Sequence, residues 1–318
     1  MADAGGKIVE LSPERRKLLE RLLREKRSVA QAPATEAAAP KLSEGLLLNT
    51  GYPESPEAHK TSYRLFYDTI TRQLDSSAVG AYSYFLNYGY VSNGAREYAI
   101  AEPPATAFNL NSIKLVLEVI GDCDLTGRRV LDVGCGRGGT VWTICNYFNA
   151  ARITGIDISR EAIAFNHATH RDPSVAFLEG DAERLPFADA SFDAVINIES
   201  SHSYPNIQSF YAEVYRVLAG GGYFLYTDLM PVQQIQACVG RLALLGFVVQ
   251  RDRDVTPNVM LSCDAIANRR LEVFDTHNDR HLMSDFLGAP GSVTYNCMQT
   301  GAWQYRIFKL HKAARQPR

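Results

Sequence analysis

The sequence predicts an α/β protein with a doubly wound, seven-stranded and mostly parallel sheet, helices on both faces of the sheet and an N-terminal helical cap. After residue 120, short apolar segments of strand length alternate with amphipathic segments of helical periodicity. Such alternation is typical of a parallel sheet covered by helices on both faces. A glycine-rich turn follows the first predicted strand, where a parallel sheet places its ligands.

The predicted strands are short apolar runs bounded by turn residues. They cover residues 129–133, 152–156, 175–178, 192–198, 221–228, 248–255 and 304–310. One predicted helix follows the glycine-rich turn and ends near residue 148. Further helices are predicted to cover residues 160–170, 207–218 and 233–245. The last strand alternates apolar and polar side chains, and we expect it to close one edge of the sheet.

The chain before this alternating region divides into two parts. Residues 11–27 form an amphipathic helix that Ser12 can cap and Pro13 can start. The Ala/Pro-rich stretch that follows has little to bury, so we interpret residues 1–40 as a helix plus linker. Residues 41–120 contain eight of the sixteen tyrosines and are predicted to form the helical cap over a site at the sheet edge. The main domain is residues 121–318.

Composition excludes several classes of protein. The formal net charge is −2, which gives no basic face for a nucleic-acid partner. We find no signal peptide and no apolar run near the ~20 residues of a membrane span, so a cytoplasmic location is expected. The six cysteines form no C-x-x-C pair, which predicts reduced thiols, and no metal requirement is indicated.

A nucleotide-type site is predicted between the first strand and its helix, at Asp132-Val-Gly-Cys-Gly-Arg-Gly-Gly139. Its glycines let the backbone turn tightly and approach a ligand closely. Asp157 ends the second strand, 21 residues after Gly136, where a carboxylate can accept both ribose hydroxyls. Gly134, Gly136 and Gly139 also satisfy the dinucleotide pattern G-x-G-x-x-G. These features alone fit either a nicotinamide dinucleotide or S-adenosylmethionine (SAM).

Three further features favour SAM. Asp132 precedes the first glycine by two residues, where the cofactor's ammonium group needs a partner. Asp181 follows the third strand and is positioned to accept from the adenine amino group. The run Ser191-Phe-Asp-Ala-Val195 then opens the fourth strand. Over residues 60–312 this ordered set resembles the class I SAM-dependent methyltransferase family, which has a Rossmann-like fold, in its small-molecule branch.

The resemblance implies SAM as the cofactor. Methyl transfer also requires a lid that excludes water and an aromatic wall near the cationic sulfonium, and we expect Tyr67 to supply that contact. The predicted cofactor-binding residues are Tyr67, Asp132, Gly134, Gly136, Asp157, Ile158, Asp181, Ala182 and Asn197.

A catalytic pair is predicted at the ends of the fourth and fifth strands. Methyl transfer is an in-line displacement, and an alcohol is a poor nucleophile while it keeps its proton. His202 lies in Glu199-Ser-Ser-His-Ser-Tyr-Pro205, directly after the fourth strand, and is the predicted general base. Asp228 ends the fifth strand and is predicted to orient it. Glu199 and Tyr204 are predicted to contact the substrate.

The run of residues 197–205, with residues 85–90 upstream, resembles O-methyltransferases that act on polyketides, nonribosomal peptides and phthiotriol or phenolic glycolipids. This resemblance implies a hydroxyl acceptor on an apolar small molecule of the polyketide or polyketide-peptide class. Residues 11–26 resemble segments that flank domains of modular synthases. They imply a carrier-protein-bound acceptor and docking to a synthase through residues 11–27. C- or N-methylation, a nicotinamide-dependent oxidoreductase and a non-catalytic module remain open alternatives.

Overall fold

The computed structural model describes residues 55–77, 79–94, 101–272 and 280–314. The chain divides into two units, Met1–Lys41 and Leu42–Arg318, and every described residue belongs to the second. The predicted helix and linker of residues 1–40 therefore lie outside the described residues. Among the described residues, no helix combines the length and apolar character that a membrane span requires.

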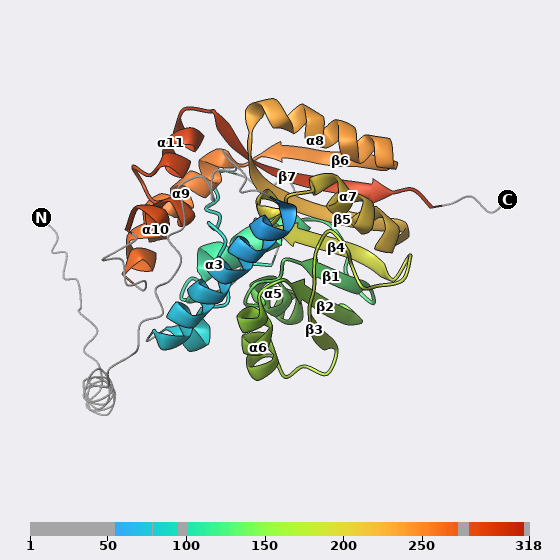
Figure 1. Ribbon diagram of the computed structural model, residues 1–318, viewed down its shortest axis with the longest axis horizontal. Coiled ribbons are helices and arrows are strands. Elements are labelled where there is room, and N and C mark those ends of the chain that lie inside the picture. Colours follow the sequence, from blue (N-terminus) through green and yellow to red (C-terminus); the bar gives the residue numbers. More distant parts are fainter. Residues whose placement is uncertain (1–54, 78, 95–100, 273–279, 315–318) are drawn as a thin grey trace, which may run out of the picture. The chain divides into compact units, whose positions relative to one another are not determined.

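A seven-stranded sheet, ordered β3-β2-β1-β4-β5-β7-β6, forms the centre of this unit (Figure 1). Neighbouring strands pair in parallel except on both sides of β7, which is antiparallel to β5 and β6. The predicted doubly wound, mostly parallel sheet is thus confirmed. The strands are β1 (Arg129–Val133), β2 (Arg152–Asp157), β3 (Val175–Glu179), β4 (Phe192–Ile198), β5 (Leu218–Pro231), β6 (Phe247–Asp254) and β7 (Trp303–Lys312).

The prediction that residues 304–310 close a sheet edge is wrong, because β7 lies between β5 and β6. Side chains of β7 are buried on both faces: Ile307 and Phe308 are adjacent in sequence, and each is at most 1% exposed. In β6 only Phe247 is buried; half-buried and exposed positions alternate along the rest of the strand, and Arg251 and Asp252 add charge. Charge and one-sided burial are typical of an edge strand, so β6 is the edge.

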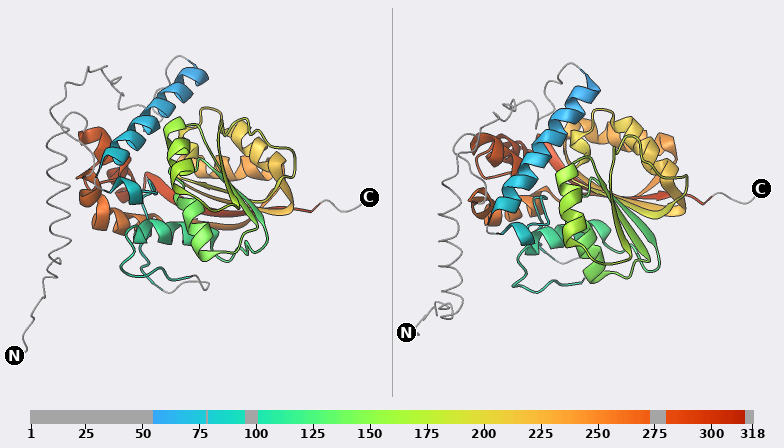
Figure 2. Two further views of the ribbon diagram at one scale, coloured as in Figure 1. Left: turned by 90° about the horizontal axis from the view of Figure 1, so that it is seen from below. Right: turned by 60° about the horizontal axis from the view of Figure 1, so that its bottom comes forward.

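Helices cover both faces of the sheet (Figure 2). Val130 belongs to the buried cluster that contains side chains of α4 and α5, whereas the next residue, Leu131, belongs to the cluster that contains side chains of α7 and α8 on the other face. This follows from the two-residue period of a strand. The covering helices are α4 (Leu110–Ile120), α5 (Gly139–Tyr147), α6 (Arg160–Thr169), α7 (Ile207–Val217) and α8 (Val232–Leu245).

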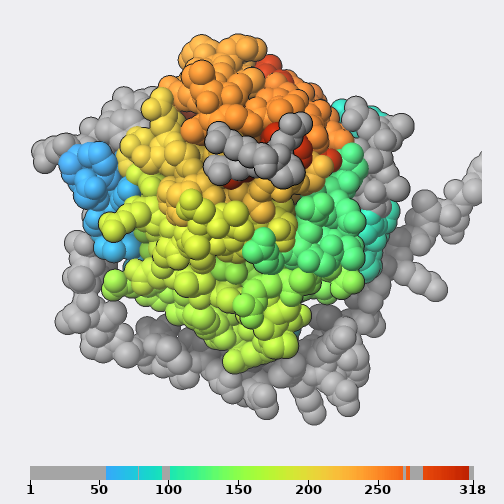
Figure 3. Space-filling model, turned by 90° about the vertical axis from the view of Figure 1, so that its right-hand side faces the viewer, coloured from blue at the N-terminus to red at the C-terminus, as the bar shows by residue number. Residues whose placement is uncertain are grey.

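A helical cap lies at the carboxyl ends of the parallel strands (Figure 1). It consists of α3 (Pro56–Ser76), α9 (Thr256–Leu271), α10 (Arg280–Phe286) and α11 (Val293–Gln299). Ser55 starts α3: its hydroxyl accepts the backbone N–H of Ala58 at 3.2 Å, and proline occupies the first helical position. Apolar side chains of α3 and α10, including Phe66, Ile70 and Phe286, share one cluster. At the opposite end of the sheet, side chains cover the surface with no deep hollow among the coloured atoms (Figure 3).

Two features differ from the predicted cap of residues 41–120. Helix α4 packs against β5, β7 and α5, so it belongs to the sheet layers. Residues 83–94 form neither helix nor strand. Their backbone groups bond to distant partners instead: the N–H of Tyr90 donates to the carbonyl of Asn111, and the carbonyl of Tyr88 accepts from Ser262. Tertiary hydrogen bonds therefore replace the helical ones that the predicted cap implied for this segment.

Candidate active site

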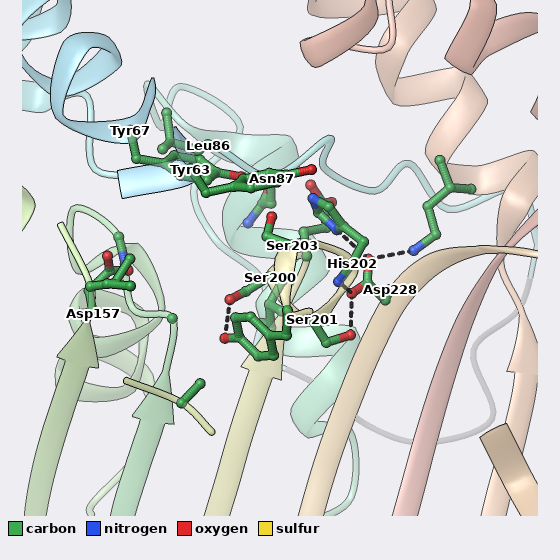
Figure 4. A pocket seen from close by; sticks show the side chains of 18 of the residues that line it. Tyr63, Tyr67, Leu86, Asn87, Asp157, Ser200, Ser201, His202, Ser203 and Asp228 are labelled. Carbon is green, nitrogen blue, oxygen red and sulfur yellow. Dashed lines mark hydrogen bonds and ion pairs between the residues drawn. The ribbon is translucent and has the colours of Figure 1, made fainter. Parts of the chain in front are cut away.

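A cavity of about 710 Å³ lies between the carboxyl ends of the strands and the cap. Figure 4 shows Asp157 on one side of it and His202 with Asp228 on the other, with Tyr63, Tyr67, Leu86 and Asn87 above. Eleven of the thirteen predicted site residues line the cavity: Tyr67, Gly134, Gly136, Asp157, Ile158, Asp181, Ala182, Glu199, His202, Tyr204 and Asp228.

The glycine loop, residues 134–139, forms the floor beside β2. Gly134 has φ +71°, and a Cβ atom there would lie 1.9 Å from the hydroxyl of Ser200. No side chain fits without moving Ser200. Asp157 holds this loop in place, because its carboxylate accepts the backbone N–H groups of Gly136 and Ser159, each at 2.8 Å. Burial is the largest cause of the raised pKa of Asp157. A carboxylate oxygen has two lone pairs, so both oxygens keep acceptor capacity for a ribose diol.

Asp132 and Asn197 are not among the residues that line the cavity; both are buried beneath its floor. Burial, with the nearby charge of Asp157, raises the pKa of Asp132 to about 8, and its Oδ2 has no hydrogen-bond partner among the described residues. A cation at this end of the cavity would supply that partner and favour the ionised carboxylate. Asn197 has a positioning contact: its Nδ2 donates to the carbonyl of Val133 at 2.8 Å and to Tyr204 Oη at 3.2 Å.

Lys60 of α3 contacts the predicted adenine side and was not anticipated from the sequence. Its ammonium group lies 2.6 Å from Asp181 Oδ2 and 2.6 Å from Glu183 Oε2. Burial lowers the pKa of Lys60, but the two carboxylates outweigh burial and raise it. An adenine amino group at Asp181 would therefore share that carboxylate with Lys60. No motif marks this lysine, because its partners lie more than a hundred residues away in sequence.

The predicted catalytic pair forms a direct contact. His202 Nδ1 lies 2.8 Å from Asp228 Oδ1, and the backbone N–H of His202 donates to Asp228 Oδ2 at 3.0 Å. The hydroxyl of Ser201 donates to the same oxygen at 2.5 Å, and the N–H of Leu229 donates to Oδ1 at 2.9 Å. Asp228 is 2% exposed, whereas the side chain of His202 is 33% exposed. With Nδ1 engaged by the carboxylate, Nε2 is the ring nitrogen left for a bound acceptor.

The electrostatics of His202 follow from its two acidic neighbours. Burial lowers the pKa of His202, but the charge and hydrogen bond of Asp228, together with the charge of Glu199, outweigh it and raise the pKa. Burial also raises the pKa of Glu199, to about 7, although this carboxylate accepts from Tyr305 Oη at 2.6 Å and from the N–H of Tyr88 at 2.8 Å. Glu199 has φ +50°, a conformation that is uncommon outside glycine and that often occurs at functional sites.

Tyrosine side chains add neutral donors to the cavity wall. Burial raises the pKa of Tyr67 and of Tyr204 above the ordinary value, so both phenols stay protonated at neutral pH. Tyr67 belongs to an aromatic group in which its ring centroid lies 6.4 Å from that of Tyr63 and 6.2 Å from that of Phe286. Tyr204 forms a short hydrogen bond with Ser200. The sequence predicted both tyrosines as site residues but not Phe286. Tertiary packing alone brings Phe286 to this wall, so no local pattern indicated it.

Ser201→Ala is expected to lower the turnover rate roughly three- to tenfold, because Asp228 loses a short hydrogen bond and His202 loses part of its orientation. The substitution also leaves Tyr226 without its 2.6 Å partner in the buried network. Steady-state kinetics across pH should show a shifted pH dependence together with the lower rate. An unchanged profile and rate would mean that Ser201 does not position Asp228.

Comparison with known proteins agrees with this geometry. A methyltransferase-domain family model matches residues 131–226, which include the glycine loop and strands β2 to β4. The phthiotriol/phenolphthiotriol dimycocerosates methyltransferase of Mycobacterium tuberculosis is 31% identical over 261 residues, covering 81% of this chain and 94% of that protein. The fatty-acid O-methyltransferase of Mycolicibacterium smegmatis is 34% identical over 256 residues, covering 79% and 90%.

The crystal structure of the [4+2]-cyclase SpnF is similar in fold, with a TM-score of 0.63 at 22% identity, covering 83% of this chain and 99% of that one. This likeness concerns the fold alone. The two sequence relatives and the family model go further: the chain belongs to the class I SAM-dependent methyltransferases, and SAM is its cofactor. The nicotinamide alternative that the glycine pattern left open therefore does not apply.

Proposed function

We propose that the protein methylates a hydroxyl group of an apolar small molecule and that His202 is the general base. The contact between His202 and Asp228 at the cavity wall carries this proposal. Bound SAM supplies an electrophilic methyl group on a sulfonium. The residues of the chain then have to bind the acceptor, exclude water and accept the hydroxyl proton, and Nε2 of His202 is the atom that would receive it. Asp228 would stabilise the resulting imidazolium.

We propose that the residues predicted from the sequence bind the cofactor and that they do so in two groups. Gly134, Gly136, Asp157, Ile158, Asp181 and Ala182 would contact it directly, with Tyr67 above the sulfonium. Asp132 would act from beneath the floor, where its Oδ2, which has no hydrogen-bond partner in the described part of the chain, supports an interaction with the cofactor's ammonium group. Asn197 would act indirectly, by fixing Tyr204.

Aromatic and aliphatic side chains on the roof support an apolar acceptor. The upper wall of the cavity is lined by Tyr63, Tyr67, Leu86 and Phe286. Exclusion of water by this wall also favours transfer of the hydroxyl proton to the neutral ring of His202. The names of the relatives refer to dimycocerosates and to fatty acids, which agrees with a long apolar acceptor. A polyketide or polyketide-peptide acceptor, a carrier-bound form and a cytoplasmic location stay predictions. Synthase docking through residues 11–27 concerns a segment outside the described residues.

A carboxylate acceptor is the second candidate, because one relative at 34% identity is named a fatty-acid O-methyltransferase. A carboxylate needs no base. The raised pKa of His202 would instead favour an imidazolium that pairs with the anionic acceptor. The two candidates therefore require opposite protonation states of the same ring.

The pH dependence of kcat/KM separates the two candidates. We expect methylation of a long-chain alcohol to rise with pH through the pKa of His202, because only the neutral ring accepts a proton. Methylation of a fatty acid of equal chain length would fall over the same range, because the imidazolium is lost. Mass spectrometry of both products at a series of pH values provides the measurement. Exclusive methylation of the fatty acid would refute the hydroxyl proposal, and methylation at carbon or nitrogen would refute both candidates.

A further inference from the structure

Arg137, in the middle of the glycine loop, is a fully buried arginine. Within the described part of the chain, the hydrogen-bond partners of its side chain lie in the segment around the end of α3. Its side chain is 0% exposed. Nε donates to the carbonyl of Ser83 at 2.7 Å and Nη2 to the carbonyl of Gly80 at 2.8 Å. Nη1 donates to Asp75 Oδ1 at 2.7 Å and contacts the carbonyl of Thr71 at 3.4 Å. One side chain thus joins the cofactor loop to two separate turns of the cap.

Hydrogen bonds from most of its N–H groups offset the free-energy cost of burying the guanidinium charge. Burial lowers the pKa of Arg137 and outweighs the Asp75 carboxylate, which raises it, but a guanidinium stays protonated at any physiological pH. The ring of Phe165 lies 3.5 Å from the guanidinium carbon and covers one face. A buried charge held by this many fixed acceptors has one favourable position, so the loop and the cap cannot shift independently without losing these bonds.

A second set of contacts joins the same two parts. A Cβ atom on Gly139 would lie 2.4 Å from the ring of Phe85, so the loop backbone and this ring are in close contact. The wall segment, which we define as residues 80–88, therefore rests on the glycine loop at several points. At its other end the N–H of Tyr88 donates to Glu199 on the acceptor side of the cavity. The wall segment thus spans the cavity from the cofactor loop to the acceptor side.

We propose that Arg137 is a positioning residue that couples occupancy of the cofactor site to the order of the wall segment. When the cofactor orders the glycine loop, the buried guanidinium transmits that order to the carbonyls of Ser83 and Gly80, and the wall on the acceptor side becomes more rigid. Such coupling is reciprocal, so an ordered wall segment also strengthens cofactor binding. The proposal concerns only the cofactor site and the cap, and it holds whether the acceptor is an alcohol or a carboxylate.

Hydrogen exchange of the full chain with S-adenosylhomocysteine, without any acceptor, tests the coupling. In the wild type we expect the ligand to slow exchange in peptides from both the glycine loop and the wall segment. In Arg137→Lys we expect protection of the glycine loop only, together with a Kd for S-adenosylhomocysteine raised about tenfold, because a lysine cannot bond several carbonyls at fixed angles. Because no acceptor is present, failure of this test is independent of the methylation proposal.

Arg72→Ala is the matched control. Arg72 pairs with Glu161 at 3.5 Å and so also links α3 to the core, but its side chain is 57% exposed. We expect ligand protection of the wall segment to persist in this variant and Kd to change less than twofold. If Arg137→Lys does not fold, Asp75→Asn, which removes the negative charge but keeps an acceptor oxygen, should give a partial loss of the coupled protection. Wild-type protection of the wall segment in either folded variant, or no ligand effect on that segment in the wild type, would overturn the proposal.

Discussion

His202→Ala is expected to lower kcat for an alcohol acceptor by roughly 10²- to 10⁴-fold, the usual contribution of a positioned general base. The Kd for S-adenosylhomocysteine should change little, because His202 lies on the far side of the cavity from Asp157 (Figure 4). Calorimetric titration and product analysis measure the two quantities separately. A variant that binds the ligand normally and methylates the alcohol at the wild-type rate would remove His202 from the mechanism.

Asp228→Asn tests whether the two side chains act as a unit. The carboxamide keeps the shape of the carboxylate but not its charge, so the pKa of His202 should fall toward the ordinary value and the rising limb of the pH profile should move to lower pH. The double variant should lose little more activity than His202→Ala alone, because residues that act together are not additive. Additive losses would mean that Asp228 acts independently of the ring.

The same pair gives a pH-dependent contribution to stability with a defined sign. The pKa of His202 is higher in the folded protein than in the unfolded chain. Its contribution is therefore fully present below the unfolded pKa of about 6.5 and is lost as pH rises through the folded value. Chemical denaturation should accordingly show a larger difference between wild type and His202→Ala at pH 6 than at pH 9.

Local patterns were sufficient to predict the strands and the residues at their carboxyl ends. A parallel strand is a short apolar run, and its last residues lie at one edge of the sheet, so Asp157 and His202 could be assigned to a common cavity from the sequence. The period of a strand gives the face of a side chain, but it does not say whether a residue near the strand end reaches the cavity or stays beneath it. This is why the sequence did not show that Asp132 and Asn197 lie beneath the floor of the cavity.

Features that depend on long-range pairing could not be predicted in this way. The position of β7 inside the sheet depends on its partners β5 and β6, which precede it by tens of residues and leave no local signal. The bonds of Arg137 and of Lys60 likewise join residues far apart in the chain. The motif around Arg137 indicated a tight turn, but nothing in it indicated a buried charge. The coupling of the cofactor loop to the cap is therefore visible only in the structure.

Gly134→Ala is expected to reduce stability by about 2–5 kcal/mol and to weaken binding of S-adenosylhomocysteine by at least roughly tenfold. The left-handed backbone costs a non-glycine residue about 1–2 kcal/mol, and relieving the overlap with Ser200 adds about 1–3 kcal/mol. Moving Ser200 also breaks its bond to Tyr204, which lines the same cavity. Denaturant unfolding and calorimetry measure both effects.

Gly127→Ala separates the two causes. Gly127 has nearly the same backbone angle, φ +68°, but a Cβ atom there meets nothing within 4 Å and the residue does not line the cavity. It should therefore lose only the backbone cost of about 1–2 kcal/mol and bind the ligand normally. The difference between the variants then measures what close packing at Gly134 contributes. Equal destabilisation with unchanged ligand affinity in both would show that the cofactor does not depend on close approach at Gly134.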